Sequence, residues 1–287
     1  MSESAASTRA AEMTTTRTEP HVAGAGSAYR ARISAELRSF FRQRESVVFT
    51  LVFPVVLLVL FGLILGGRSE VTPGVSFTQY FVAGMIAAGV LASSFQNLAI
   101  MIPIERDTGL LKRLRGTPMP KSAYFIGKVV QVIVVCVVEI VLLLVVGMLL
   151  FDVSLPATPT KWLVFIGVVL LGTASCTLLG IAFSSVPKSG RGAPAMVTPI
   201  ALILQFISGV FFVFTLLPAW LQIVASLFPL KWMTQGMRYV FLPDSAKAAE
   251  AAGEWELGTI FLVLGAWTVV GLALCALTFR WRSRTDG

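Results

Sequence analysis

The stretch VVFTLVFPVVLLVLFGLILG occupies residues 47–66 and contains no charged residue over its 20 positions. A bilayer hydrocarbon core about 30 Å thick needs about 20 residues of α-helix to cross it. Backbone polar groups find no water there, so they must bond within the segment, as they do in a helix. Residues 47–66 therefore predict a transmembrane helix, which we expect to kink at Pro54.

Five further apolar blocks are long enough to cross a membrane. They lie at approximately Phe77–Ile102, Ala123–Phe151, Trp162–Val186, Met196–Leu217 and Leu257–Phe279. The sequence thus predicts an all-α polytopic membrane protein, in which residues 47–284 form a domain of six transmembrane helices.

The composition excludes several other classes of protein. The 287 residues are 56% hydrophobic and only 13% charged, whereas soluble domains carry about 25% charged residues. A net charge of +8 would suit a nucleic-acid binder, but the basic residues fall between the apolar blocks. With a cytoplasmic N-terminus, 18 Lys and Arg residues lie inside and 5 outside. The positive-inside rule therefore predicts that both termini are cytoplasmic.

The region before the first block divides into two parts. Residues 1–27 are rich in Ser, Thr, Ala and Gly, which predicts a disordered cytoplasmic tail. Because the first apolar block begins only at Val47, no cleaved signal is expected. Residues 28–46 predict an amphipathic interfacial helix, whose apolar face of Ile33, Leu37, Phe40 and Phe41 is surrounded by Arg30, Arg32, Arg38, Arg42 and Arg44.

The sequence offers few groups for catalysis or metal binding. The three cysteines lie in apolar blocks without a CxxC pair, and His21 is the single histidine, so a zinc site or metalloenzyme is not expected. No GxxxxGK[ST] loop is present to hold a nucleotide. We expect no cofactor in this chain, and energy for any active process has to come from a partner.

The loop after the second block combines charge and amphipathicity. Glu105-Arg106-Asp107 precedes a short apolar and basic stretch that ends at Gly116 and Pro118. This pattern suits docking of a soluble partner at the cytoplasmic membrane boundary. It fits equally well a solvated loop that obeys the positive-inside rule.

Two motifs resemble those of a known family. Glu105-Arg106-Asp107-Thr108-Gly109, followed by Thr117-Pro118, is similar to the E-R-E-x-G-T and T-P segment of ABC-2 type transporter permeases, with Asp107 and Leu110 in place of the usual Glu and Thr. Ser208–Phe212, Leu217–Leu221 and Phe228–Leu230 resemble the family's S-G-x-x-F-P, L-P-x-W-L and N-P-L run, with Val213 for Pro and Phe228 for Asn. The similarity spans residues 28–284 and is greatest to the daunorubicin-resistance subgroup of drug and lipid exporters.

The resemblance implies a permease subunit rather than an enzyme. It implies two ABC ATP-binding subunits as partners, which would hold ATP and Mg²⁺, and a second permease copy or a homologous permease. The residues expected to couple to the ATPase are Glu105, Arg106, Asp107, Thr108, Gly109, Lys112, Arg113, Arg115, Arg38 and Arg42. Because the spans consist mainly of Phe, Val, Leu and Met, a hydrophobic or amphiphilic cargo is expected.

Residues 218–256 are too apolar for a simple external loop. Pro218, Pro229 and Pro243 divide this segment into pieces too short to span the bilayer. The resemblance implies a re-entrant helical hairpin that seals the outer end of the pathway; an interfacial loop anchored by Trp and Tyr is the alternative. The residues expected at the pathway or external gate are Glu139, Gln205, Ser208, Gly209, Phe211, Phe212, Trp220 and Pro229.

Glu139 is the only ionisable residue deep within a predicted span. Intramembrane carboxylates are costly and usually face a bundle interior or a water-filled cavity. Glu139 is therefore a candidate pathway residue. The alternative is a neutral buried carboxyl without a transport role, or one paired with a polar neighbour such as Gln131.

Two other transport functions remain open. A permease of a polysaccharide or glycolipid ABC exporter would share these motifs. A proton-coupled secondary carrier is the weaker alternative, because such carriers usually need several intramembrane ionisable groups and often internal repeats.

Overall fold

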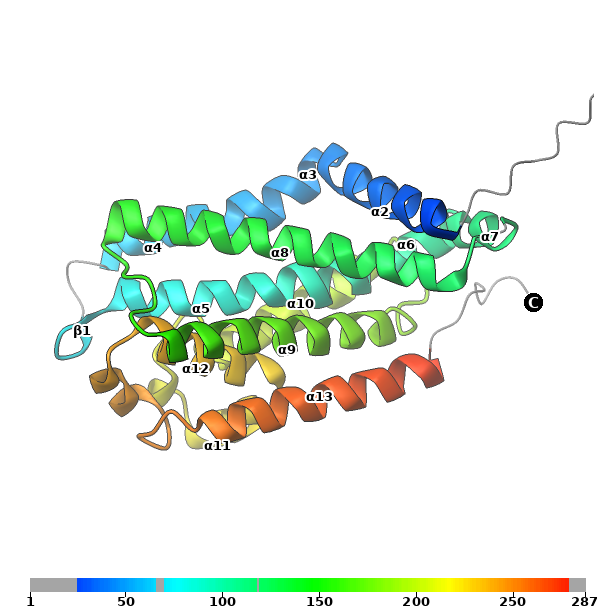
Figure 1. Cartoon of the computed structure of the whole chain (residues 1–287). Helices are drawn as coiled ribbons and strands as arrows, with labels where there is room; N and C mark the ends of the chain where they lie inside the picture. The colour runs from blue at the N-terminus through cyan, green and yellow to red at the C-terminus, as the bar shows by residue number, and fades with distance from the viewer. Residues whose placement is uncertain (1–24, 66–69, 118, 279–287) are drawn as a thin grey trace, which may run out of the picture.

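The computed structural model describes residues 25–65, 70–117 and 119–278, and within these the elements between the loops are helices except for one short hairpin (Figure 1). Most of the predicted tail, residues 1–24, lies outside the described residues. The first half contains α2 (Ala25–Arg42), α3 (Arg44–Val47), the π-helical turn η1 (Val48–Val52), α4 (Phe53–Leu65), the antiparallel strands β1 (Glu70–Thr72) and β2 (Val75–Ser76), α5 (Phe77–Leu91), the π-helical turn η2 (Ala92–Gln96), α6 (Asn97–Asp107) and α7 (Leu110–Arg115).

The second half begins with the longest helix. It contains α8 (Lys121–Phe151), α9 (Pro159–Phe183), α10 (Ala193–Ile207), the 3₁₀ turn η3 (Phe214–Leu216), α11 (Ala219–Ser226), α12 (Pro229–Phe241), the 3₁₀ turn η4 (Asp244–Ala249) and α13 (Leu257–Thr278). This confirms the predicted all-α polytopic class.

Five helical stretches in the described part are long and apolar enough to cross a membrane: Arg44–Leu65, Phe77–Asp107, Lys121–Phe151, Pro159–Phe183 and Leu257–Thr278. The predicted fifth block differs, because its helix α10 ends at Ile207 rather than Leu217. The chain turns at Gly209, whose backbone is left-handed with φ 75°, a conformation that favours glycine. With 15 residues, α10 extends about 22 Å, less than the hydrocarbon core.

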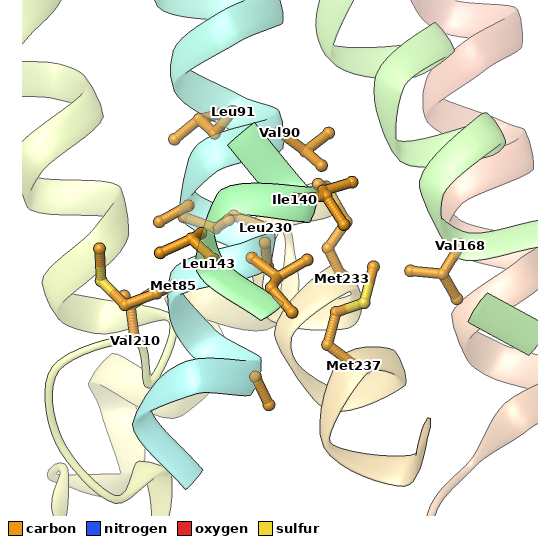
Figure 2. Packing of buried hydrophobic residues seen from close by; sticks show 14 of the residues in the cluster. Met85, Val90, Leu91, Ile140, Leu143, Val168, Val210, Leu230, Met233 and Met237 are labelled. Atoms are coloured by element: carbon orange, nitrogen blue, oxygen red, sulfur yellow. The ribbon is translucent and has the colours of Figure 1, made fainter. Parts of the chain in front are cut away.

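The core is built around α5 and α12. In α5, 14 of 15 residues are buried, and in α12, 12 of 13. Figure 2 shows Met85 of α5 and Met233 of α12 within this core, close to Ile140 and Leu143 of α8. By contrast, α4 and α13 expose large apolar side chains such as Leu63 and Leu277, which suits contact with lipid.

The bundle has two different ends. At one, which we call the basic end, α6 meets α7 beside α2 and the start of α8 (Figure 1). At the other, which we call the hairpin end, lie β1, β2 and the pair α11 and α12. Helices α11 and α12 are joined by Leu227 and Phe228, so the proline-divided segment folds as a helical hairpin.

Candidate functional site

Five side chains form a buried cluster at the basic end, which we call the junction cluster. Lys128 of α8 contacts carboxylates from two other helices: Glu36 of α2, with Nζ–Oε2 2.9 Å, and Glu105 of α6. Glu36 also pairs with Arg32, and the hydroxyl of Tyr124 donates to Glu105 at 2.7 Å. Two positive and two negative groups thus balance one another, as burial of charge requires.

The two residues after Glu105 connect α6 by hydrogen bonds to the end of α9 and to the loop before α10. The guanidinium of Arg106 donates to the carbonyl of Ser184, which caps the end of α9, at 2.5 Å. A carboxylate oxygen of Asp107 accepts from the backbone N–H of Gly190, before α10, at 2.5 Å. The Glu-Arg-Asp triplet therefore contacts α8, the end of α9 and the loop before α10, and it is connected to α2 through Lys128.

The predicted coupling residues fall into two groups. Glu105, Arg106 and Asp107 contact the chain's own elements through their side chains, as described above. Thr108, Lys112, Arg113, Arg38 and Arg42 are exposed, Gly109 is half-buried, and the side chain of Arg115 lies outside the described part. In α7, Leu111 is buried while Lys112 and Arg113 face outward. Among the predicted coupling residues, those that a partner can reach therefore lie on α7 and on the outer side of α2.

The interpretation of α2 needs two corrections. We expected Arg32 among the arginines around a lipid-facing apolar surface, but it is 8% exposed and faces α8 with Glu36. Phe40, expected on the lipid-facing surface, is 5% exposed and packs against Leu51 and Val135, whereas Phe41 is exposed as predicted. Sequence reasoning also missed Glu36, Tyr124 and Lys128. The four-residue spacing of Arg32 and Glu36 was the one local signal.

Glu139 lies at the centre of the bundle, without a partner. It is 1% exposed, and neither carboxylate oxygen has a hydrogen-bond partner among the described residues. The alternative in which Glu139 pairs with Gln131 is therefore wrong. Its carboxyl faces Gly89 of α5, where an added Cβ would lie 2.5 Å from Oε1. The missing side chain of Gly89 provides the space that Glu139 fills.

We expect Glu139→Leu to raise the thermal unfolding temperature of the purified permease. A buried polar group without a hydrogen bond costs about 1–3 kcal/mol, and leucine of similar volume removes that cost. Tryptophan fluorescence during heating measures the shift, with Val137→Leu, on the exposed side of the same helix, as the control. A lower unfolding temperature for Glu139→Leu would show that the carboxyl stabilises the fold.

An aromatic cluster lies towards the hairpin end. Phe81 of α5 lies with its ring centroid 5.1 Å from that of Phe61 in α4 and 6.2 Å from that of Phe211. Phe206 of α10 packs against both Phe211 and Phe212, with centroid distances of 4.8 and 6.0 Å. The cluster joins α4, α5, α10 and the turn that follows α10.

The predicted gate residues are only partly brought together. The turn of residues 208–214, which we call the gate turn, contains Ser208, Gly209 and Phe211, all buried. Pro229 is buried at the start of α12, and Gln205 is half-buried in α10. Trp220, in contrast, is 65% exposed on α11 and makes no ring contact with this cluster among the described residues.

A groove of about 430 Å³ opens between the start of the first span, α6 and α10. Both π-helical turns contribute to its lining, through Phe49 and Thr50 of η1 and Gln96 of η2. Such turns occur frequently at functional sites. The groove combines apolar and polar side chains, among them Glu45, Ser46, Phe49, Thr50, Gln96, Asn97 and Ile100.

Comparisons with known proteins identify a family and several related transport permeases. The sequence profile described as ABC-2 type transporter matches residues 27–242. The chain is 29% identical over 201 residues to the inner membrane transport permease YadH of Escherichia coli (strain K12), covering 67% of this chain and 75% of that protein. It is 25% identical over 238 residues to the putative transport permease ycf38 of Porphyra purpurea, covering 80% and 81%. A putative transport permease of Bacillus subtilis (strain 168), YvfS, is 22% identical over 195 residues, covering 68% and 78%.

Proposed function

Because this chain belongs to the ABC-2 type transporter family, we propose that it is the permease subunit of an ABC exporter. Members of this family are membrane transport subunits that work with an ABC ATP-binding subunit. The proposed cargo is a hydrophobic or amphiphilic molecule, such as a drug, an antibiotic or a lipid, which leaves the cytoplasm. ATP and Mg²⁺ bind to two copies of the ATP-binding partner.

The proposed topology has both termini in the cytoplasm. The basic end then faces the cytoplasm, in agreement with the positive-inside rule. The sixth crossing is made by α10 together with the gate turn, because α10 alone is too short. Residues 28–46 lie at the membrane interface, and α11 and α12 form a hairpin that enters the outer side of the bilayer.

The observation that carries the proposal is the position of the Glu-Arg-Asp triplet. It ends the helical stretch Phe77–Asp107, and the opposite end of this stretch contacts the gate turn through Tyr80. The ATP-binding subunit docks on α7 and α2, through the exposed Arg113, Arg38 and Arg42. Movement of α7 then displaces the junction cluster. The helical stretch Phe77–Asp107 transmits this movement to the gate turn at the hairpin end.

The proposed pathway follows the face formed by α4, α5 to α6, and α10. The groove that Phe49 and Gln96 line offers both apolar and polar contacts, which suits an amphiphilic cargo. A second permease copy, or a homologous one, closes this open groove into a pathway. The aromatic cluster around Phe81 and Phe211 and the gate turn block the pathway on the outer side, and the carboxyl of Glu139 packs against Gly89 of α5.

The structure contains further buried charged side chains that bear on the secondary-carrier alternative. Besides Glu139, the described part buries six Lys, Arg and Glu side chains: Arg32, Glu36, Lys128, Lys231, Arg238 and Glu250. They belong to α2, the start of α8, α12 and the residue after η4, so Glu139 remains the one carboxylate deep within a predicted span. These six have ionic partners, which suits a structural role better than proton transfer. A polysaccharide or glycolipid exporter remains the second candidate, because the polar part of the groove would suit sugar hydroxyls.

Transport in inside-out membrane vesicles tests the proposal. Vesicles containing the permease and its ATP-binding subunit should accumulate an anthracycline or an NBD-labelled phospholipid when ATP is added. Glu105→Lys should abolish this accumulation, because it places a second cation beside Lys128. Vesicles that accumulate neither probe with ATP, or that keep full transport with Glu105→Lys, would contradict the proposal.

A further inference from the structure

Helix α12 carries two buried cations at the hairpin end. Lys231 is 2% exposed and Arg238 is fully buried. Removing an ion from water is costly unless its charge and hydrogen bonds are satisfied within the protein. The groups that satisfy these two cations therefore identify the elements that α12 holds in place.

The guanidinium of Arg238 donates hydrogen bonds to two different segments. Its Nε and Nη2 donate to the two carboxylate oxygens of Glu250, which follows η4, at 2.5 and 3.0 Å. Its Nη1 donates to the carbonyl oxygen of Gly209 in the gate turn at 3.2 Å. The bidentate pair with Glu250 fixes the plane of the guanidinium, and this plane directs Nη1 at Gly209.

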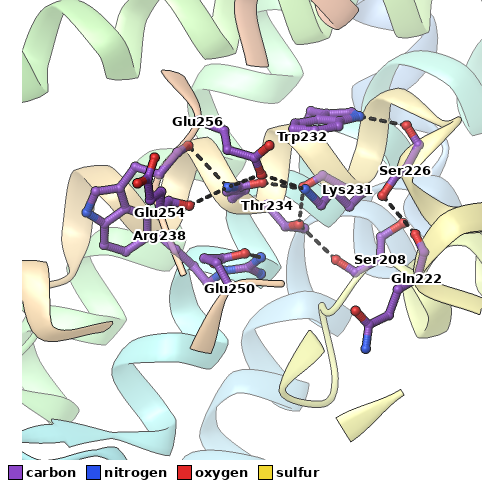
Figure 3. Close-up of polar contacts among 12 residues, drawn as sticks. Ser208, Gln222, Ser226, Lys231, Trp232, Thr234, Arg238, Glu250, Glu254 and Glu256 are labelled. Atoms are coloured by element: carbon purple, nitrogen blue, oxygen red, sulfur yellow. Dashed lines mark hydrogen bonds and ion pairs between the residues drawn. The ribbon is translucent and has the colours of Figure 1, made fainter. Parts of the chain in front are cut away.

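The same side of α12 contacts the gate turn at two more points. The hydroxyl of Thr234 donates to the carbonyl oxygen of Ser208 at 2.8 Å (Figure 3). The ammonium of Lys231 lies 5.5 Å from the ring centroid of Phe214. Residues 231, 234 and 238 are three and four positions apart, so they lie on one face of the helix. This face of α12 therefore contacts the gate turn from Ser208 to Phe214.

Helix α5 holds the gate turn from another direction. The hydroxyl of Tyr80 accepts a hydrogen bond from the backbone N–H of Phe214 at 3.1 Å. At Gly84, an added Cβ would lie 2.9 Å from the carbonyl oxygen of Val210, so the turn lies directly on the helix backbone. The guanidinium of Arg238 is 4.8 Å from the ring centroid of Tyr80. Arg238 therefore lies where α5, α12 and the gate turn meet.

We propose that Arg238 is a positioning residue for the outer gate, and that its pair with Glu250 keeps the gate turn closed against α5. This inference rests on the proposed function, in which the gate turn blocks the outer end of the pathway. Arginine suits this role because its planar guanidinium can donate hydrogen bonds to a carboxylate and to a carbonyl at the same time. Lysine offers a single point charge. Opening then requires either that Nη1 releases Gly209 or that α12 moves together with the turn.

Thiol labelling of Val210→Cys tests the inference. Val210 is fully buried in the gate turn, so a water-soluble maleimide should react slowly with it in the nucleotide-free permease–ATPase complex in nanodiscs. The variant Arg238→Met/Glu250→Leu removes both charges together and leaves no unpaired ion. Loss of a hydrogen bond from a charged group should accelerate labelling about tenfold or more, and Arg238→Lys should give an intermediate rate. Lys247→Met, which removes an exposed cation from η4, should leave the rate unchanged.

The native thiols distinguish gate opening from general loosening. Cys136 and Cys176 are buried within the bundle, and mass spectrometry can measure their labelling in the same samples. They should stay unreactive in the double variant. An unchanged rate at Val210→Cys, or equal acceleration at Cys176, would overturn the role of Arg238. Trapping the ATPase with ATP and vanadate, which holds ADP in its site after hydrolysis, tests the gate itself: if Val210→Cys then stays protected in the otherwise unmodified complex, the proposed gate fails instead.

Discussion

Replacing Lys128 by methionine should destabilise the permease by about 3–5 kcal/mol, the usual cost of removing one partner from a buried ion pair. Lys128 is 2% exposed, and its ammonium contacts Glu36 and Glu105. Without it, Glu105 keeps only the hydrogen bond from Tyr124 in the junction cluster. Thermal unfolding of the purified permease measures the loss, with Lys121→Met, an exposed lysine of the same helix, as the matched control.

A second variant separates stability from coupling. Lys128→Met/Glu105→Gln removes one positive and one negative charge and leaves the Arg32–Glu36 pair balanced, so stability should largely return. Coupling should not return, because no ionic contact then joins α6 to α8. We expect ATP hydrolysis by the complex without cargo-dependent stimulation. Equal stability of Lys128→Met and Lys121→Met, or full coupling in the double variant, would contradict this role of the junction cluster.

The pair of charge reversals Arg42→Glu/Arg113→Glu should abolish co-purification of the ATP-binding subunit. Both side chains are exposed, Arg113 on α7 at the basic end and Arg42 at the last residue of α2, so their reversal should leave the fold intact while it replaces attraction by repulsion at the docking surface. A loss of about tenfold or more in recovered ATPase corresponds to about 1.4 kcal/mol of binding energy. Affinity purification followed by quantification of both subunits measures it.

The matched control for this variant lies at the other end of the bundle. Lys247→Glu reverses an exposed charge in η4 and should leave recovery of the ATPase unchanged. Equal recovery with Arg42→Glu/Arg113→Glu and with Lys247→Glu would show that the ATP-binding subunit does not dock on α2 and α7.

The apolar runs predict much of the fold, because the length of a run and its lack of charge are local properties. Five of the expected spans have helical counterparts of sufficient length. The end of α10 is less predictable, because residues 208–217 are as apolar as the helix before them. There the turn depends on a backbone conformation at Gly209 and on contacts with Thr234 and Arg238.

The candidate sites were less predictable, because they depend on contacts between distant segments. Lys128 lies 92 residues from Glu36 and 23 from Glu105. Because it follows a charged loop, the sequence alone does not distinguish it from the basic residues that set membrane orientation. The sequence places Arg238 among the few external basic residues, yet it is fully buried and paired with Glu250. The sequence indicates where charges lie along the chain. Which charges form buried ion pairs depends on how the helices pack.

Site-specific photo-crosslinking from α7 tests the central claim most directly. A photoreactive residue replaces Arg113 at the basic end, and the same residue replaces the exposed Trp220 of α11 as a control. After irradiation of intact cells, mass spectrometry identifies the adducts. The account predicts that position 113, and not position 220, captures a protein with a GxxxxGK[ST] phosphate-binding loop. Absence of such an adduct at position 113, or its presence only at position 220, would contradict a permease driven by an ATP-binding subunit at its basic end.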